Sequence, residues 1–402
     1  MASKRLDYDD AYTTRFRARI ADADTRENAA RVELEETFFY PESGGQEADR
    51  GSLGGVPVVD VQTADDGRIW HTLGPGSAVP SGEADAEVDW ARRFDHMQQH
   101  TGQHILSAAF ERLCDAATLS SHLGEERSDI ELELGDADWR LVERVEEAAY
   151  RVIWDDRPIE RHWVDDEGVK RFALRKATKV TGRIRIVEIP DWDVSACGGT
   201  HTRRTGEVGA IKIVRWEKVR GNVRFEFLCG ARALKDHAWR TEALLEAAKR
   251  RTLKDRELIA HLERAASERD ELKRRLAELT ANAIAAEARL RVGDPAAGVA
   301  TFWPERPREE VRTFAIKALE AGAPWVVAAA GGPEPCLVAA RAKQGRGDLK
   351  ALVPELLARG RGKGGGAPDF VQIACADAAS AESAFEYAGR EVPRAVNGEG
   401  GA

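Results

Sequence analysis

Hydrophobic and polar residues alternate with a period of two in the first ninety positions of the chain. Short alternating runs such as RFRARI (15–20) and RVELEE (31–36) are separated by clusters of Gly, Pro and Asp, as in SGGQEADRGSLGG (43–55). Alternation of this kind is typical of half-buried β-strands joined by turns. The pattern therefore predicts a small β-barrel or sandwich over residues 1–92.

The period becomes helical beyond this region. The segment DHMQQHTGQHILSAAFERLC (95–114) predicts one helix, with Asp95 as its N-cap and Gln98 at the capping-box position. Residues 138–155 predict a second helix, and AIKIVRWEKVRGNVRFEFL (210–228) predicts a β-hairpin that turns at residues 220–222. We therefore expect an α+β domain over residues 93–231.

The sequence of residues 232–294 is highly charged and predicts helical structure. Their apolar positions recur at an average spacing of 3.5 residues, at Leu258, Leu262, Ala265, Leu272, Leu276, Leu279 and Ala283. This spacing predicts a short coiled coil or a helical hairpin, and a helix that packs on its own domain is the alternative. The segment is locally basic, since residues 232–291 contain fifteen Lys and Arg against eleven Asp and Glu.

Strand-like and helix-like segments alternate after a Gly and Pro break near residues 293–295. Examples are WVVAAAG (325–331), CLVAARA (336–342) and DFVQIACA (369–376), which predict a small α/β domain over residues 295–402. The segment GRGKGGGAPD (360–369) predicts a glycine-rich loop in this domain. The expected fold class is α+β: a barrel, an α+β domain, a helical segment and a C-terminal α/β domain.

Composition narrows the class of protein. The 402 residues are 43% hydrophobic and 32% charged, with a formal net charge of −9. This charge argues against a broadly basic nucleic-acid binder, although a local basic surface is enough to bind phosphate. No apolar run approaches the length of a membrane span, and the N-terminus lacks the apolar core of a signal peptide. Five scattered cysteines without a CxxC pair indicate a reducing cytoplasm.

Two short motifs carry residues that suit a metal. His100 and His104 are spaced i, i+4 on the predicted helix, so both imidazoles can reach one ion. In SACGGTH (195–201), two glycines allow Cys197 and His201 to converge on one point. Cysteine with histidine favours zinc. The alternatives are a pair of surface histidines and a structural turn around a buried cysteine.

The chemistry of such a zinc ion is left open by these residues. No Glu follows His100 in an H-E-x-x-H arrangement, so the general base of zinc proteases is absent. Four protein ligands would close a tetrahedral site, whereas a catalytic zinc keeps one position open. Either one ligand stays unbound, or the metal positions the substrate without supplying hydroxide.

A third motif, TFFYPESGGQEADRG (37–51), combines aromatic residues, a Pro turn and two glycines. Gly44 and Gly45 allow close approach of a ligand to the backbone, and Gln46 offers a neutral amide. A β-turn without function is the alternative.

Together these motifs resemble the editing part of alanyl-tRNA synthetase and, more closely, the free-standing alanyl-tRNA editing proteins of the AlaX type. The segments 37–51, 92–110 and 197–213 resemble that family's Gly-Gly-Gln motif and its two zinc motifs, in the same order. The segment 360–372 resembles the glycine-rich motif of the synthetase's C-terminal domain, as in the long form of the editing proteins. Since no aminoacylation domain precedes the first motif, we expect editing in trans.

The resemblance implies an activity and its cofactor. The expected reaction is hydrolysis of the ester that links serine, and also glycine, to the terminal adenosine of tRNA for alanine. The aminoacylation site of a synthetase for alanine cannot fully reject these two amino acids, so a second site must remove them from the tRNA. One zinc ion per chain is expected, bound by His100, His104 and Cys197, with His201 as the fourth ligand or in a supporting position.

The resemblance also assigns further roles. Thr37 is expected to recognise the serine hydroxyl, and Gln46 with Gly44 and Gly45 to orient the ester. Asp193 is expected to orient a histidine ligand, with a solvated loop aspartate as the alternative. Candidates for contact with tRNA are Arg92, Arg93, Lys363, Gly364 and Gly365, where ordinary charged or flexible surface is the alternative. A homodimer through the helical segment and the absence of a membrane partner complete the expectations.

Three other functions compete with this interpretation. A related editing enzyme for threonyl-tRNA shares the zinc motifs but is disfavoured by the intact SGGQ and GKGGG segments. A non-catalytic tRNA-binding module with a structural zinc is the alternative from a different class, and four protein ligands would be its signature. A DHH phosphoesterase requires a tandem Asp-His-His set, and only Asp95-His96-Met97 is present.

Overall fold

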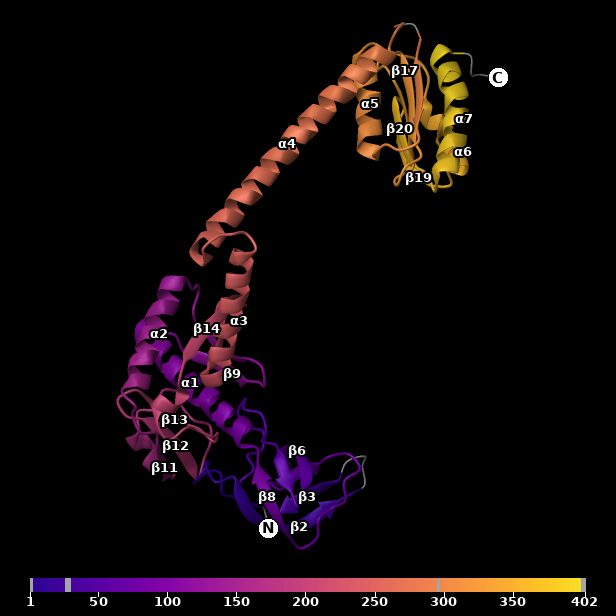
Figure 1. Ribbon diagram of the computed structural model, residues 1–402. Coiled ribbons are helices and arrows are strands. Elements are labelled where there is room, and N and C mark those ends of the chain that lie inside the picture. Colours follow the sequence, from indigo (N-terminus) through magenta and orange to yellow (C-terminus); the bar gives the residue numbers. More distant parts are fainter. Residues whose placement is uncertain (1–2, 26–29, 295–296, 399–402) are drawn as a thin grey trace. The chain divides into compact units, whose positions relative to one another are not determined.

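The computed structural model describes residues 3–25, 30–294 and 297–398 (Figure 1). The chain divides into two compact units, residues 1–251 and residues 252–402. Both units combine helices and strands, so the expected α+β class is confirmed.

Six strands of the first unit close into a barrel in the order β2-β3-β7-β6-β5-β8. Their bounds are β2 (Arg15–Asp24), β3 (Arg31–Leu34), β5 (Gly51–Leu53), β6 (Val56–Thr63), β7 (Ile69–Leu73) and β8 (Glu83–Val88). The alternating apolar residues of these strands form one buried cluster that includes Val32, Leu34 and Leu73. The barrel expected from the alternation is therefore confirmed.

The Gly-Gly-Gln segment leaves the barrel and attaches to the neighbouring layer. It follows β4 (Glu36–Thr37), which pairs in parallel with β1 (Lys4–Arg5). Gln46 then forms an isolated bridge with Leu123, at the end of β9 (Thr118–Leu123). Gly45 lies against that strand with a φ of 85°, and a Cβ there would lie 2.5 Å from the Ser121 carbonyl oxygen. Only glycine permits this approach.

Helix α1 (Trp90–Cys114) is the centre of the first unit and is buried along most of its length. Its N-cap is Asp89, whose side chain accepts a hydrogen bond from the backbone of Arg92. The expected N-cap at Asp95 is therefore wrong, and α1 crosses the predicted domain boundary at residue 92. The helix begins five residues earlier than predicted, so Asp95 lies within it, where its side chain forms an ion pair with Arg232.

Two antiparallel sheets and one helix surround α1. The four-stranded sheet has the order β14-β15-β10-β9 and the three-stranded sheet the order β11-β12-β13. The new bounds are β10 (Ser128–Leu132), α2 (Trp139–Trp154), β11 (Glu160–Val164), β12 (Ile184–Ile189), β13 (Asp193–Ala196), β14 (Ile211–Val219) and β15 (Asn222–Cys229). The predicted second helix and the hairpin are confirmed. The hairpin turns at Arg220 and Gly221, both with positive φ, as a tight two-residue turn requires.

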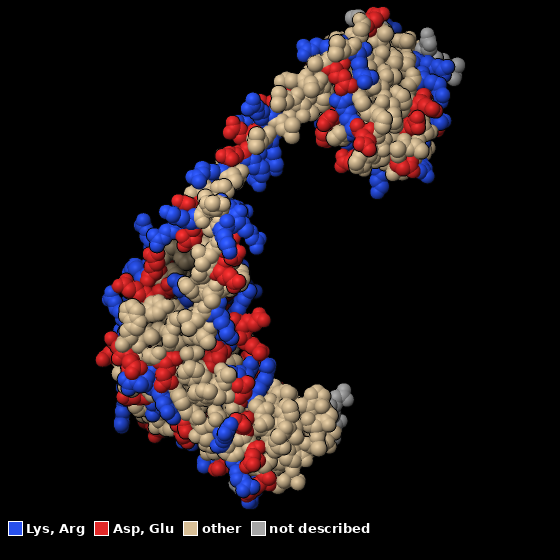
Figure 2. All heavy atoms as spheres, in the orientation of Figure 1, with Lys and Arg blue, Asp and Glu red and all other residues tan. Residues whose placement is uncertain are grey.

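The predicted helical segment contains α3 (Gly230–Lys249), in the first unit, and α4 (Leu258–Arg291), in the second. The C-terminal part of α4 buries Ile284 and Ala288, whereas Leu272, Leu276 and Leu279 are exposed. Figure 2 shows basic side chains along this helix, interspersed with acidic ones. None of the helices within the described residues is long and apolar enough to cross a membrane.

The second unit is a five-stranded sheet between two helical layers. The strand order is β16-β17-β18-β20-β19, with α4 and α5 on one face and α6 and α7 on the other (Figure 1). The bounds are β16 (Val299–Trp303), α5 (Arg308–Glu320), β17 (Trp325–Ala330), β18 (Cys336–Arg341), α6 (Val353–Gly360), β19 (Lys363–Ala367), β20 (Phe370–Ala374) and α7 (Ala378–Asn397). The predicted start of this domain, residue 295, lies outside the described residues.

The glycine-rich segment differs from the prediction of a loop. Lys363–Ala367 forms the edge strand β19, which pairs antiparallel with β20. A Cβ at Gly364 would lie 2.3 Å from the Gln372 carbonyl oxygen, and one at Gly366 would lie 2.0 Å from that of Phe370. The glycines therefore serve a close approach of two strands, which a reading of glycine as a loop former cannot detect.

Candidate metal centre

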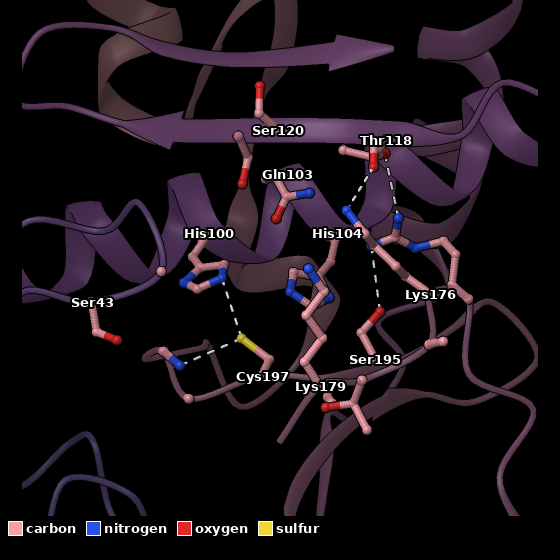
Figure 3. Close-up of a pocket in the computed structure, with 18 of the residues that line it drawn as sticks. Ser43, His100, Gln103, His104, Thr118, Ser120, Lys176, Lys179, Ser195 and Cys197 are labelled. Carbon is pink, nitrogen blue, oxygen red and sulfur yellow. Dashed lines mark hydrogen bonds between the residues drawn. The ribbon is translucent and has the colours of Figure 1, made fainter. Parts of the chain in front are cut away.

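The four predicted metal ligands converge in the first unit. His100 and His104 project from α1 toward Cys197, which lies on the loop that follows β13 (Figure 3). His201 lies on the same loop. Their ligand atoms all lie within 4.8 Å of one another. Sγ of Cys197 is 3.3 Å from Nε2 of His100 and 3.2 Å from Nε2 of His201. Residues almost one hundred positions apart in sequence thus form one cluster.

The two glycines of the loop have different functions. A Cβ at Gly199 would lie 2.1 Å from Cε1 of His100 and 2.9 Å from Oε1 of Gln46. A Cβ at Gly198 would meet only the Tyr8 ring, at ordinary contact distance. Gly199 is therefore required for Cys197 and the helix to approach each other, whereas Gly198 is not.

In each histidine of the cluster, the Nδ1 atom forms a hydrogen bond that orients the ring. Nδ1 of His100 lies 2.7 Å from Oε1 of Gln46, and Nδ1 of His104 lies 2.7 Å from Oδ2 of Asp193. Nδ1 of His201 is 3.3 Å from the Thr101 hydroxyl. These partners leave the Nε2 atoms free to face the thiol, which is the arrangement that metal-binding histidines need.

The electrostatics of the cluster favour a thiolate. Burial alone would raise the pKa of the Cys197 thiol, but His100 and His201 reverse this and hold the pKa well below its usual range. Burial would lower the pKa of His104, yet its hydrogen bond to Asp193 raises it to about 9. Burial and the nearby His100 lower the pKa of His201. The site thus holds one anionic sulfur among three imidazoles.

This donor set fits zinc. Three imidazole nitrogens with one thiolate are typical of zinc sites, and calcium and magnesium prefer oxygen.

The cluster lies at the base of a pocket of about 360 Å³ lined by residues 118–121, 175–179 and 195–199, and by side chains of α1. Tyr40, Ser43 and Gly44 complete its wall. A small ligand can therefore reach the metal ligands from one side.

The Gly-Gly-Gln motif contributes to the pocket and to its support. Gly44 lines the pocket, and Gly45 attaches the motif to β9. Gln46 is fully buried and has both ends of its amide engaged. Its Oε1 contacts His100 and also accepts a hydrogen bond from the Thr200 backbone, and its Nε2 donates to the Thr200 hydroxyl. Gln46 is thus a positioning residue.

Thr37, predicted to recognise serine, is fully buried and is not among the residues that line the pocket. Its Oγ1 lies 2.9 Å from Nε2 of His71 and accepts a hydrogen bond from the backbone of Phe39. Nδ1 of His71 lies 3.2 Å from the Val32 carbonyl oxygen, so Nε2 is the acceptor and the Thr37 hydroxyl donates. In this conformation the hydroxyl has no access to a ligand in the pocket.

Arg92 and Arg93, predicted to contact tRNA, are engaged inside the unit. Arg93 has no exposed surface and forms an ion pair with Asp49, with further hydrogen bonds to backbone carbonyls. Arg92 pairs with Glu47 at 2.7 Å. Both arginines therefore join α1 to the barrel side of the unit. We do not retain them as phosphate contacts.

The remaining predicted residues lie in different parts of the chain. Asp193 is buried beside His104, and both His104 and Arg175 hold the pKa of its carboxyl at about 2 against the effect of burial. This excludes the alternative of a solvated loop aspartate. Lys363, Gly364 and Gly365 belong to β19 in the second unit, where Lys363 is exposed.

Sequence reasoning missed two sets of pocket residues. Gln103 follows His100 by three positions on α1 and presents an amide to the pocket (Figure 3). The segment of residues 173–183 has no helix or strand and carries three basic residues into the pocket wall. The run RKATK (175–179) was the available signal, but a short basic run in a loop does not reveal what it faces.

Comparison with known proteins supports this location. The family profile of the "Threonyl and Alanyl tRNA synthetase second additional domain" matches residues 184–225, which include Cys197 and His201. Alanyl-tRNA editing protein AlaX-L of Pyrococcus horikoshii is 38% identical over 239 residues, which are 58% of this chain and 59% of that protein. Alanyl-tRNA editing protein Aarsd1-B of Xenopus laevis is 36% identical over 220 residues, 53% of each chain.

An alanine–tRNA ligase of Pyrococcus abyssi is also similar, with 34% identity over 265 residues, which are 61% of this chain and 28% of that enzyme. The matches thus span between half and three fifths of the length of the editing proteins, and a smaller part of the ligase. The resemblance to free-standing alanyl-tRNA editing proteins of the AlaX type is confirmed.

Proposed function

We propose, from the similarity to alanyl-tRNA editing proteins, that this chain is an aminoacyl-tRNA deacylase. Its substrate would be tRNA for alanine that carries serine, or glycine, in place of alanine. The observation that carries the proposal is the buried cluster of His100, His104, Cys197 and His201 at the base of a polar pocket. Such a pocket can hold a small aminoacyl group beside the ligands of a metal ion.

The cofactor of the proposal is one zinc ion per chain. When bound, zinc can polarise an ester carbonyl or lower the pKa of a water molecule. The protein's own contribution is to fix the ligands. Gln46 and Asp193 orient His100 and His104, and Gly199 allows the cysteine loop to reach the helix.

We assign the discrimination between serine and alanine on the tRNA to polar groups that line the pocket. The pocket that contains the metal ligands is also lined by Ser43, Gln103 and Ser120, and each of these offers a hydrogen-bonding group. A polar group left without its partner penalises a substrate that lacks the hydroxyl. Serine can satisfy such a group and alanine cannot. Glycine lacks the hydroxyl as well, so we expect it to be hydrolysed less efficiently than serine.

The second unit is proposed to hold the body of the tRNA. Lys363 on the exposed edge strand β19 supplies positive charge. A Cβ at Gly365 would meet no atom within 4 Å, so this glycine leaves room for an RNA backbone, whereas Gly364 serves the approach of β20. The exposed leucines of α4 are proposed to pair two copies of the chain, since their spacing suits a coiled coil. We expect the protein to act in the cytoplasm.

One observation favours a second function. Four protein ligands can close a tetrahedral zinc site, which is the signature of a structural metal. The chain would then bind tRNA without hydrolysing the ester. The wide pocket beside the ligands favours the deacylase, because a purely structural site needs no access for a ligand.

Turnover on mischarged tRNA distinguishes the two functions. Serine-charged and alanine-charged tRNA for alanine are incubated separately with the wild-type chain and with Cys197→Ala, and the remaining ester is measured over time. The deacylase predicts rapid loss of serine, slow loss of alanine and strongly reduced loss with the variant. Binding of both tRNAs without turnover would instead support the tRNA-binding module.

A further inference from the structure

The pocket beside the metal ligands is positively charged at one side. Of the residues that line it, Arg175, Lys176 and Lys179 are basic and none is Asp or Glu. This is unexpected in a chain with a net charge of −9. Figure 3 shows Lys176 and Lys179 at the side of the pocket that also holds His104 and Ser195.

Arg175 holds this basic segment in place. Its backbone N–H donates to the Val194 carbonyl, and its guanidinium donates to Asp193 at 2.6 Å. The charge of Arg175 is therefore compensated by a buried carboxylate. The anchored segment runs beside β13, and it presents the two lysines to the pocket from a fixed position.

The two lysines themselves are not compensated by carboxylates. Nζ of Lys176 donates to the carbonyl oxygens of Thr118 and Leu119, at 3.2 and 3.4 Å, and both lysine side chains are exposed. Within the part of the chain that the structure describes, neither lysine forms an ion pair. Two ammonium groups at the wall of one pocket attract an anion.

We infer that Lys176 and Lys179 bind the last phosphodiester of the tRNA strand, which links the terminal adenosine to the preceding nucleotide. This inference rests on the proposed function, which brings the aminoacyl ester to the metal ligands. The aminoacyl group itself carries no negative charge, because its carboxyl is esterified and its amino group is neutral or cationic. The phosphodiester on the other side of the adenosine is the nearest anion of such a substrate.

The contact would set the distance between the ester and the metal ligands. Ammonium groups on flexible stems bind phosphate as point charges, which position a strand without reading its bases. The lysines are therefore positioning residues, and their loss should raise KM much more than it lowers kcat.

The test removes the charge from each side of the contact in turn. Serine-charged minihelices are prepared with the natural last phosphodiester or with a neutral methylphosphonate at that position. Each is hydrolysed by the wild-type chain, by Lys176→Ala/Lys179→Ala and by the charge-preserving Lys176→Arg/Lys179→Arg. Lys170→Ala is the matched control, since Lys170 lies on the same stretch of chain, is paired with Glu167 and does not line the pocket.

The wild type should prefer the natural minihelix by about tenfold or more in kcat/KM, because a hydrogen bond to a charged group is worth at least this much. The double alanine variant should hydrolyse both minihelices with the same kcat/KM. The logarithm of its kcat/KM should also depend less on the logarithm of salt concentration, by about 0.7 for one phosphate on a single strand. The arginine and Lys170 variants should behave as the wild type.

Two results would overturn the inference. One is a wild type that does not distinguish the two minihelices. The other is a double variant that keeps the wild-type preference for the natural phosphodiester, or that loses kcat with unchanged KM. Failure of the proposed function has a different signature, because the wild type would then hydrolyse neither minihelix.

Discussion

Oε1 of Gln46 lies 2.7 Å from Nδ1 of His100, and both side chains are buried. The contact connects the Gly-Gly-Gln segment to the helix that carries two of the candidate metal ligands. It fixes the His100 ring so that Nε2 faces Cys197. The Gly-Gly-Gln motif, which the sequence analysis assigned to the substrate, therefore acts on the candidate metal ligand His100.

Replacement of Gln46 should weaken the metal site. Gln46→Ala removes the partner of His100 and two hydrogen bonds to Thr200. We expect zinc affinity to fall about 10- to 100-fold, as for other supporting partners of metal ligands. Competition with a chromogenic chelator measures this affinity. Gln62→Ala, on the exposed barrel surface, is the control, and equal affinities for the two variants would contradict the assigned role.

The two glycines of the cysteine loop provide a paired test of geometry. Gly199→Ala places a methyl group 2.1 Å from His100, so we expect loss of bound zinc and of deacylation. Gly198→Ala adds the same methyl group in ordinary contact with Tyr8 and should leave both intact. Metal content by mass spectrometry and tRNA turnover are measured for both. Full zinc binding by Gly199→Ala would show that the loop approaches the helix differently.

Replacement of Thr37 distinguishes the sequence prediction from the structural one. The sequence prediction is that Thr37→Val selectively weakens hydrolysis of serine-charged tRNA. The structure predicts a loss of about 1–3 kcal/mol in the free energy of unfolding, because Nε2 of His71 loses its buried partner. Denaturant unfolding and turnover of serine- and glycine-charged tRNA are compared. A serine-specific loss with unchanged stability would support direct recognition by Thr37.

Acid should destabilise the barrel through His71. Burial lowers the pKa of His71 from 6.5 to about 4, so the folded state binds a proton less readily than the unfolded state. The contribution of neutral His71 to the free energy of unfolding is therefore fully present above pH 6.5. About 3 kcal/mol of it is lost as the pH falls through 4.

His71→Gln cannot take up this proton, so its free energy of unfolding should fall less between pH 7 and pH 4. Urea unfolding at several pH values measures the difference from the wild type. Burial also lowers the pKa of His96 to about 4, which adds the same dependence to both proteins. Parallel pH curves for the two proteins would contradict the assignment to His71.

The exposed leucines of α4 make the oligomeric state testable. If they pair two copies of the chain, Leu272→Glu/Leu276→Glu should convert a dimer into a monomer at micromolar concentration. Ile259→Gln is the control, since Ile259 is exposed on the same helix but lies outside the 3.5-residue spacing. Sedimentation velocity measures both variants. A wild type that is monomeric would refute the proposed dimer.

The sequence alone determined the features that depend on local spacing. Alternation predicted the barrel, helical periodicity predicted α1 and α2, and the Arg220–Gly221 turn located the hairpin. The four residues of the candidate metal centre were also predicted, because an i, i+4 pair on a helix and a Cys-Gly-Gly-Thr-His turn each restrict geometry within a few residues. Such patterns indicate which side chains can converge, even when the two motifs are far apart.

Only the tertiary structure decided what each remaining polar residue faces. Thr37 pairs with His71, Arg93 with Asp49, and the glycines of β19 pack on β20 instead of forming a loop. The lysines of residues 173–183 acquire a role only because Arg175 joins that segment to β13. These contacts link positions far apart in the chain, and burial decides them through the requirement that buried polar groups find partners. Local spacing contains no information about such partners.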